Sequence, residues 1–208
     1  MRIKDIAKSI LITICFTISI PVSAETDTTD ADLYQVNIIV FEHITPQALN
    51  SEIWSAITDL PDLENSIEPQ LLSSEDSQLQ TENGYLSDET AQKDNYKVLL
   101  NIAWQQEIPV TQQAEQPIHI LGDKIDGTIT INKDRYFDIK TNLILTEPIS
   151  YLNSIGPGNY INIANNEFTS FQMKQTRRLK SNELNYIDHP LFGMLIEIVP
   201  LEQEQVSS

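Results

Sequence analysis

Seven segments of the chain carry apolar residues in the pattern of β-strands, and most of them alternate between apolar and polar positions. The segment YKVLLNIAW gives the strongest strand signal, since its apolar residues fall at every second position. FGMLIEIV is almost continuously apolar, which favours a strand in the interior of a sheet. The polar stretch NKDR between two alternating segments predicts a hairpin turn. The predicted strands are 33–41, 96–104, 117–121, 127–131, 136–145, 170–179 and 192–199.

Helical signals are confined to the first half of the chain. Thr45 stands just before Pro46, and apolar residues follow at four-residue spacing, so a short helix is predicted within 45–57. A second helix start is predicted at Ser87, while 58–85 is polar and predicts a long surface excursion. The predicted fold class is therefore α+β, with one largely antiparallel sheet of about six to seven strands and a helical layer contributed by the N-terminal half.

The first 24 residues have the layout of a cleaved secretory signal peptide. Basic residues precede the apolar stretch SILITICFTISI, and small residues end the segment at Ala24. A retained membrane anchor is the alternative, but the apolar stretch is shorter than the ~20 residues that a spanning helix needs. We expect residues 1–24 to be a cleaved leader, 25–32 a flexible lead-in, 33–202 a single domain and 203–208 a disordered tail.

The chain is strongly acidic, with 13 Lys and Arg against 30 Asp and Glu and a formal charge of −17. Loss of Arg2, Lys4, Lys8 and Asp5 with the leader would bring the charge to −19. This charge argues against nucleic acid and anionic membrane surfaces as general partners, and no membrane insertion of the mature chain is expected. The single cysteine, Cys15, lies in the leader, so the mature protein would form no disulfide.

No recognised enzyme motif is present in the sequence. The three histidines are far apart along the chain, so neither a metal site nor a cofactor is predicted. Asp188 and His189 are neighbours, and on an extended chain they would point to opposite faces rather than form an acid–base pair. Pro190 marks a bend before the last strand. Asp188, His189 and Pro190 are therefore assigned structural roles at a corner, and the protein is predicted not to be an enzyme.

The scarce cations gather near the end of the chain. Lys174, Arg178 and Lys180 share the polar face of the strand at 170–179, whereas Arg177 shares the apolar face, where a buried arginine would need an acidic partner. Arg177 is therefore given a structural role. The other three form a cationic stripe spanning about 20 Å. The stripe is either a ligand-binding site or a solvated face that pairs with some of the many acids, and the sequence leaves both open.

The same region resembles a known family. RRLKSNELNYIDHPLFGMLIEI is similar to the C-terminal signature of the CsiV family of periplasmic cell-shape-integrity proteins. YQVNIIVFEH, YKVLLNIAWQQ and DGTITINKDRYFDIKTNLIL agree with that family in order along the chain. The resemblance covers most of residues 33–200.

This resemblance implies a non-enzymatic periplasmic protein that binds peptidoglycan. It further implies support of cell-wall assembly through an outer-membrane lipoprotein activator and its class A penicillin-binding protein. On this view the stripe would contact stem-peptide carboxylates, and Trp104, Tyr136 and Tyr186 would offer surface for stacking sugars. Two alternatives remain: a periplasmic protein-interaction module that uses the acidic face and the 58–85 segment, and a wall hydrolase, for which no carboxylate pair stands out in the sequence.

Overall fold

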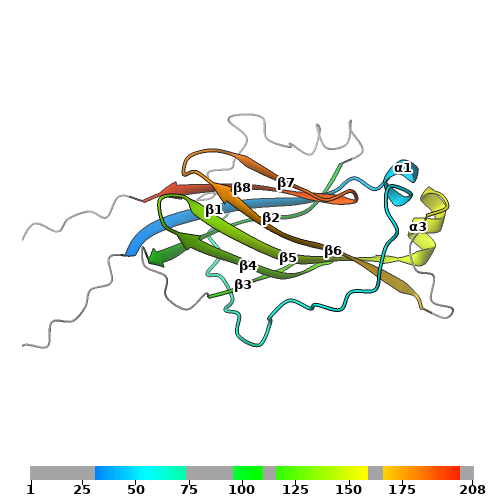
Figure 1. Ribbon diagram of the computed structural model, residues 1–208, viewed down its shortest axis with the longest axis horizontal. Helices are drawn as coiled ribbons and strands as arrows, with labels where there is room; N and C mark the ends of the chain where they lie inside the picture. The colour runs from blue at the N-terminus through cyan, green and yellow to red at the C-terminus, as the bar shows by residue number, and fades with distance from the viewer. Residues whose placement is uncertain (1–30, 74–95, 110–115, 159–165, 202–208) are drawn as a thin grey trace, which may run out of the picture.

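The described residues, 31–73, 96–109, 116–158 and 166–201 of the computed structural model, form two antiparallel four-stranded sheets that lie over one another (Figure 1). The strand order is β2-β1-β8-β7 in the first sheet and β3-β4-β5-β6 in the second. The strands are β1 (Ala31–Glu42), β2 (Lys97–Pro109), β3 (Ile118–Leu121), β4 (Ile125–Lys133), β5 (Phe137–Pro148), β6 (Phe168–Leu179), β7 (Asn185–Asp188) and β8 (Phe192–Pro200). The helices are α1 (Pro46–Leu49) and α3 (Ile149–Ile155).

The predicted fold class is wrong, because the described chain is mostly β and has no helical layer. The apolar face of each sheet is covered by the other sheet instead. One cluster of buried residues joins Val36, Ile38 and Val40 of β1 to Ile139 and Leu143 of β5. Eight strands therefore bury one another, and helices are needed only at one end (Figure 1).

The predicted strands are present, and β1 begins at Ala31, two residues before the predicted start. The last strand is an interior one as predicted, since β8 pairs with β1 on one side and β7 on the other. The predicted hairpin turn joins β4 to β5, and the register places Ile131 opposite Ile139. Along β5 the apolar residues are buried at every second position, as the alternation predicted.

The predicted helix within 45–57 starts correctly but ends after one turn. The side chain of Thr45 accepts a hydrogen bond from the Ala48 amide, and Pro46 is the first helical residue. Ile53 is 86% exposed, so the four-residue apolar spacing does not correspond to a buried helix face. α3 was not predicted, and the predicted helix start at Ser87 lies outside the described residues, as do the leader and the C-terminal tail.

One long side of the sandwich is covered by residues 66–72, here called the strap. Its Ile67 amide donates to the Pro117 carbonyl and its Ile67 carbonyl accepts from His119, while Leu72 donates to Ala103 of β2. The His119 ring contacts Glu68 of the strap at 2.5 Å and Asp126 of β4 at 2.8 Å. The strap therefore pairs with the edges of both β3 and β2, and it protects them from unwanted strand addition.

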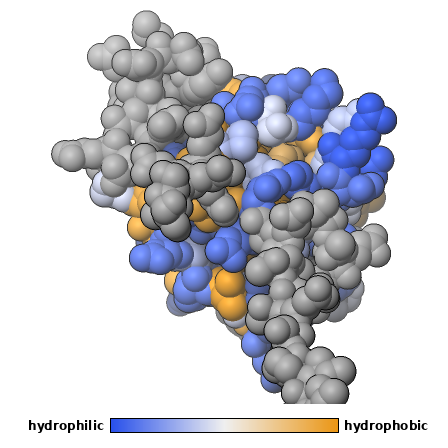
Figure 2. Space-filling model, turned by 90° about the vertical axis from the view of Figure 1, so that its left-hand side faces the viewer, coloured by the Kyte–Doolittle hydropathy of each residue, from blue (hydrophilic) through white to orange (hydrophobic). Residues whose placement is uncertain are grey.

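The two ends of the sandwich differ. α1 and α3 lie together at one end, whereas the β4–β5 and β6–β7 turns lie at the other (Figure 1). The described residues visible at the turn end are mainly hydrophilic, with hydrophobic residues exposed between them (Figure 2). None of the described helices is long and apolar enough to cross a membrane.

Gly127 of β4 lies against the backbone of β5 and provides a stability test of this sheet. A Cβ at Gly127 would stand 2.1 Å from the Asn142 carbonyl oxygen and 2.8 Å from the Leu143 Cα, and neither atom can move without breaking the β4–β5 ladder. We expect Gly127→Ala to lower the free energy of unfolding by about 2 kcal/mol or more. Gly122→Ala is the control, because its nearest atoms lie at 3.6 Å. Equal urea-unfolding free energies for the two variants would contradict the β4–β5 register.

Candidate functional site

A groove with a volume of about 550 Å³ follows the long side of the sandwich that the strap does not cover. Its walls are β6, the β7–β8 corner at 188–190 and the segment 52–57 that follows α1. β6 and β7 are the outermost strands of their sheets on this side. The volume is within the range of about 300–1,000 Å³ typical of ligand sites. This edge groove brings together residues far apart in the sequence, and it is the candidate functional site.

Arg177 is the cation of the edge groove. Its position on β6 has the same parity as the buried Phe171, Met173 and Leu179, as predicted, yet its side chain is exposed. The predicted burial of Arg177 against an acid is therefore wrong. The physical reason is its place at an edge, where an inward-facing position still reaches solvent. The guanidinium donates to the Gln175 side-chain oxygen at 2.8 Å, and no acid of the described residues lies within ion-pair distance.

The end of the groove near α1 has an aromatic wall that is closed to solvent. The Trp54 ring packs edge-on against Phe171 at 5.2 Å and lies 5.6 Å from His189. Its indole N–H donates to the Leu49 carbonyl at 2.9 Å, and only 8% of the residue is exposed. Trp54 therefore anchors the segment 52–57 and does not present an open ring face.

The corner residues Asp188, His189 and Pro190 line the same groove. The His189 Nδ1 accepts the Leu191 amide at 3.2 Å, and the His189 amide donates to the Phe192 carbonyl at 3.1 Å. Burial, reinforced by nearby His43, lowers the pKa of His189 to about 4, so the ring is neutral at pH 7. The Asp188 carboxylate accepts from the Tyr186 hydroxyl at 2.5 Å. Among the described residues, no hydrogen bond or ion pair links the Asp188 carboxylate to the His189 ring.

The predicted cationic stripe is exposed, and each of its members is matched with an acid. Lys174 pairs with Asp59, Arg178 binds Asp138 through two hydrogen bonds at 2.9 and 3.1 Å, and Lys180 reaches Glu183 at 3.2 Å. The Arg178 guanidinium holds the pKa of Asp138 below its usual value. The stripe is therefore largely neutralised by local partners, in contrast to Arg177.

The three aromatic residues predicted to stack sugars do not form one surface. Trp104 is 1% exposed in the core and donates to the Gln106 side chain at 3.1 Å. Tyr136 lies in the β4–β5 turn, where Arg135 sits over its ring. Tyr186 is 50% exposed, but its ring stacks on Phe41. Among the three, Tyr186 alone keeps half of its surface open, and it does not line the edge groove.

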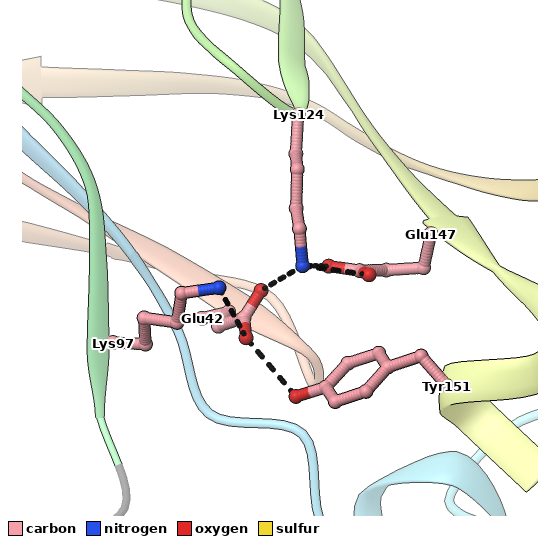
Figure 3. A network of polar contacts seen from close by, with 5 residues as sticks. All are labelled: Glu42, Lys97, Lys124, Glu147 and Tyr151. Carbon is pink, nitrogen blue, oxygen red and sulfur yellow. Dashed lines mark hydrogen bonds and ion pairs between the residues drawn. The ribbon is translucent and has the colours of Figure 1, made fainter.

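A second polar arrangement, which the sequence did not indicate, joins the two sheets near α3 (Figure 3). Lys124 donates to both Glu147 carboxylate oxygens at 2.7 and 2.8 Å and to Glu42 at 3.4 Å. Tyr151 of α3 donates to Glu42 at 3.1 Å, and Lys97 lies 3.7 Å from the same carboxylate. Glu42 ends β1 and Glu147 lies near the end of β5, so Lys124 bridges one sheet to the other.

The two carboxyls of this cluster titrate differently. Burial and the neighbouring Glu42 carboxyl raise the pKa of Glu147 to about 7, although Lys124 opposes the change. Burial also acts to raise the pKa of Glu42, but Glu147, Lys124 and Lys97 outweigh it and the pKa falls. Glu42 is 3% exposed and Glu147 is fully buried. A saccharide cannot reach carboxyls buried to this extent, so the pair ties the sheets together and does not have the exposure that glycoside hydrolysis requires.

Within the described residues, no group of three or more His, Cys, Asp and Glu side chains is arranged to hold a metal ion. The groups that the edge groove offers to a ligand are instead polar side chains and the guanidinium of Arg177, which is not paired with a described acid. The groove can therefore bind a ligand by polar contacts and charge.

The raised pKa of Glu147 predicts a pH-dependent stability. Between the ordinary value of 4.5 and about 7 the folded protein holds a proton that the unfolded chain has lost, so the free energy of unfolding falls as pH rises. Replacing Glu147 with Gln removes this dependence. Between about pH 5 and about pH 8, we expect the free energy of unfolding of the wild type to fall by on the order of 2–3 kcal/mol more than that of Glu147→Gln. Urea unfolding at each pH measures both. Parallel pH profiles of the two proteins would contradict the assignment; exposed Glu107→Gln is the control and should follow the wild type.

A family model described as "Peptidoglycan-binding protein, CsiV" matches residues 6–201. No curated protein sequence and no solved structure matches the chain. The family match covers nearly the whole chain and agrees with the resemblance seen in its strand and corner segments, and the chain therefore belongs to the CsiV family.

Proposed function

We propose that this protein is a non-enzymatic, periplasmic peptidoglycan-binding protein and that it contacts the wall through the edge groove. The observation that carries the location is Arg177, an exposed guanidinium without an acidic partner among the described residues, in a groove of about 550 Å³. The description of the family supports peptidoglycan as the ligand.

The chemistry of peptidoglycan suits such a site. Its stem peptides carry carboxylates, and a guanidinium binds a carboxylate through two parallel hydrogen bonds with defined geometry. The chain as a whole is acidic, with a formal net charge of −17, and would repel polyanions that approach other faces. In the groove, a carboxylate of the wall meets the Arg177 guanidinium, which has no acidic partner among the described residues.

The cationic stripe remains a second candidate contact surface. Lys174, Arg178 and Lys180 share one exposed face, and a ligand could compete with their present partners. Each such exchange breaks one ion pair to form another, so the net gain is small, and exposed pairs are worth only about 0.2–1 kcal/mol. Binding of a carboxylate to Arg177 breaks no ion pair with a described acid, and this favours the edge groove over the stripe.

We further propose that wall binding supports wall assembly, by helping an outer-membrane lipoprotein activate its class A penicillin-binding protein. The family resemblance supports these partners. A hydrolase is disfavoured, because the paired carboxyls of Glu42 and Glu147 are buried. Release of soluble muropeptides by the purified protein would overturn the non-enzymatic part of the proposal.

Sedimentation with purified sacculi tests the wall-binding proposal and its location together. We expect the wild type to pellet with sacculi at low salt and less at high salt. Arg177→Gln should lose most of the binding, whereas the triple change of Lys174, Arg178 and Lys180 to Ala should keep most of it. Thermal melting of each variant shows whether it is folded. No pelleting of the wild type would refute peptidoglycan binding; loss of binding in the folded triple variant alone would move the contact to the stripe.

A further inference from the structure

We propose that the edge groove receives the stem peptide of peptidoglycan, extended along β6 with a carboxylate on Arg177, and that the glycan strand stays outside the groove. This inference rests on the proposed function and adds which part of the polymer is recognised. It follows from the shape of the groove, the free edge of β6, the charges on its walls and the state of its aromatic residues.

The groove follows the edge of β6 and not one face of the sheet. Ser170, Phe171 and Gln172 all line it, and successive residues of a strand point to opposite faces. A space that contacts both faces must lie alongside the strand. The lining positions extend from Ser170 to Arg177, about 23 Å at ~3.3 Å per residue. An extended peptide of five residues spans up to about 17 Å and fits this length.

The backbone of β6 is available on the groove side. β6 pairs with β5 along its whole length, and no described residue forms backbone hydrogen bonds with its other edge. The opposite side of the sandwich differs, because there the strap occupies the edges of β2 and β3. An unpaired edge beside a groove is the arrangement by which proteins bind an extended peptide as an added strand.

The walls of the groove carry both signs of charge. Arg177 provides the cation, while the acidic residues Glu52 and Asp188 line the same space. Asp188 already accepts from the Tyr186 hydroxyl, which holds its side chain in place. A ligand that bears carboxylates together with a free amino group matches this set better than a polyanion does. Stem peptides that contain a diamino acid have this composition, and the glycan backbone has no amino group of that kind.

The aromatic residues at the groove do not suit a sugar. Stacking on a pyranose ring needs an open aromatic face, and Trp54 is 8% exposed with both its ring and its N–H engaged. Phe171 is 2% exposed. Tyr186, which keeps half of its surface open, is outside the lining of the groove. The groove therefore offers charge and backbone groups to a peptide and no stacking platform to a glycan.

Titration of the purified protein with separated wall fragments tests this inference. The probes are a free stem tetrapeptide, the same peptide with its carboxylates amidated, and glycan strands from which amidase has removed the peptides. Isothermal calorimetry or NMR titration measures affinity, and competition against sacculi measures whether each fragment uses the same site. We expect the free peptide to bind and to displace sacculi, the amidated peptide to bind at least about tenfold more weakly, and the denuded glycan to do neither.

A pair of neighbouring arginine variants provides the matched control. Arg177→Gln should weaken peptide binding by about tenfold or more, whereas Arg178→Gln, whose guanidinium binds Asp138 on the other face of β6, should leave it within about twofold. If the protein pellets with sacculi, but denuded glycan displaces it from them and the peptide does not, the stem-peptide inference is wrong while wall binding stands. If the wild type binds neither sacculi nor any fragment, the proposed function fails as well. Equal peptide affinity in folded Arg177→Gln and the wild type would also overturn the inference.

Discussion

The inward face of each four-stranded sheet in this protein is apolar, and the requirement to cover both inward faces determines most of the remaining structure. The inward residues of β1 and β8 meet those of β4 and β5 in a single buried cluster. Removing this apolar surface from water is the main favourable contribution to folding. Because each sheet covers the other, α1 and α3 serve only to close one end, where Leu49 and Leu152 are completely buried.

A sandwich of two open sheets leaves two long sides at which strand edges meet solvent, and this chain treats them differently. The strap pairs with β2 and β3 and closes one side. Near α3, Lys124 bridges Glu42 of one sheet to Glu147 of the other and fixes their spacing there. On the side between β6 and β7, no described residue pairs with the backbone of β6. The segment 52–57 and the hydrogen bond from the Gln175 side chain to the Asp188 carbonyl close part of this side, and the edge groove lies there. The location of the candidate site is therefore a consequence of how the sheets are closed elsewhere.

The alternation of apolar residues was sufficient to predict seven of the eight described strands, because it depends on neighbouring residues, and Pro190 predicted the corner before β8. The short strand β7 was not predicted. It was not sufficient to predict how strands assemble. Arg177 shows the difference: parity correctly placed it on the inward face, but only the strand order shows that β6 is an edge, where an inward side chain reaches solvent. The cluster of Glu42 and Glu147 had no sequence signal, since 105 positions separate them among many acids. The helix predicted within 45–57 starts as predicted but ends after one turn, because apolar spacing alone does not show which residues are covered by the rest of the fold.

The distribution of charge favours selection of a ligand by shape. Three cations of the stripe are matched by Asp59, Asp138 and Glu183, so the chain has no broad positive surface there despite four cations within seven residues. A broad positive surface attracts any anion. One guanidinium inside a groove binds a carboxylate only where the rest of the ligand also fits. The surrounding acids strengthen this distinction, because they disfavour ligands whose negative charge is spread along a chain. Because the stripe is neutralised and Arg177 is not, an anionic ligand is attracted to β6 mainly at the position of Arg177.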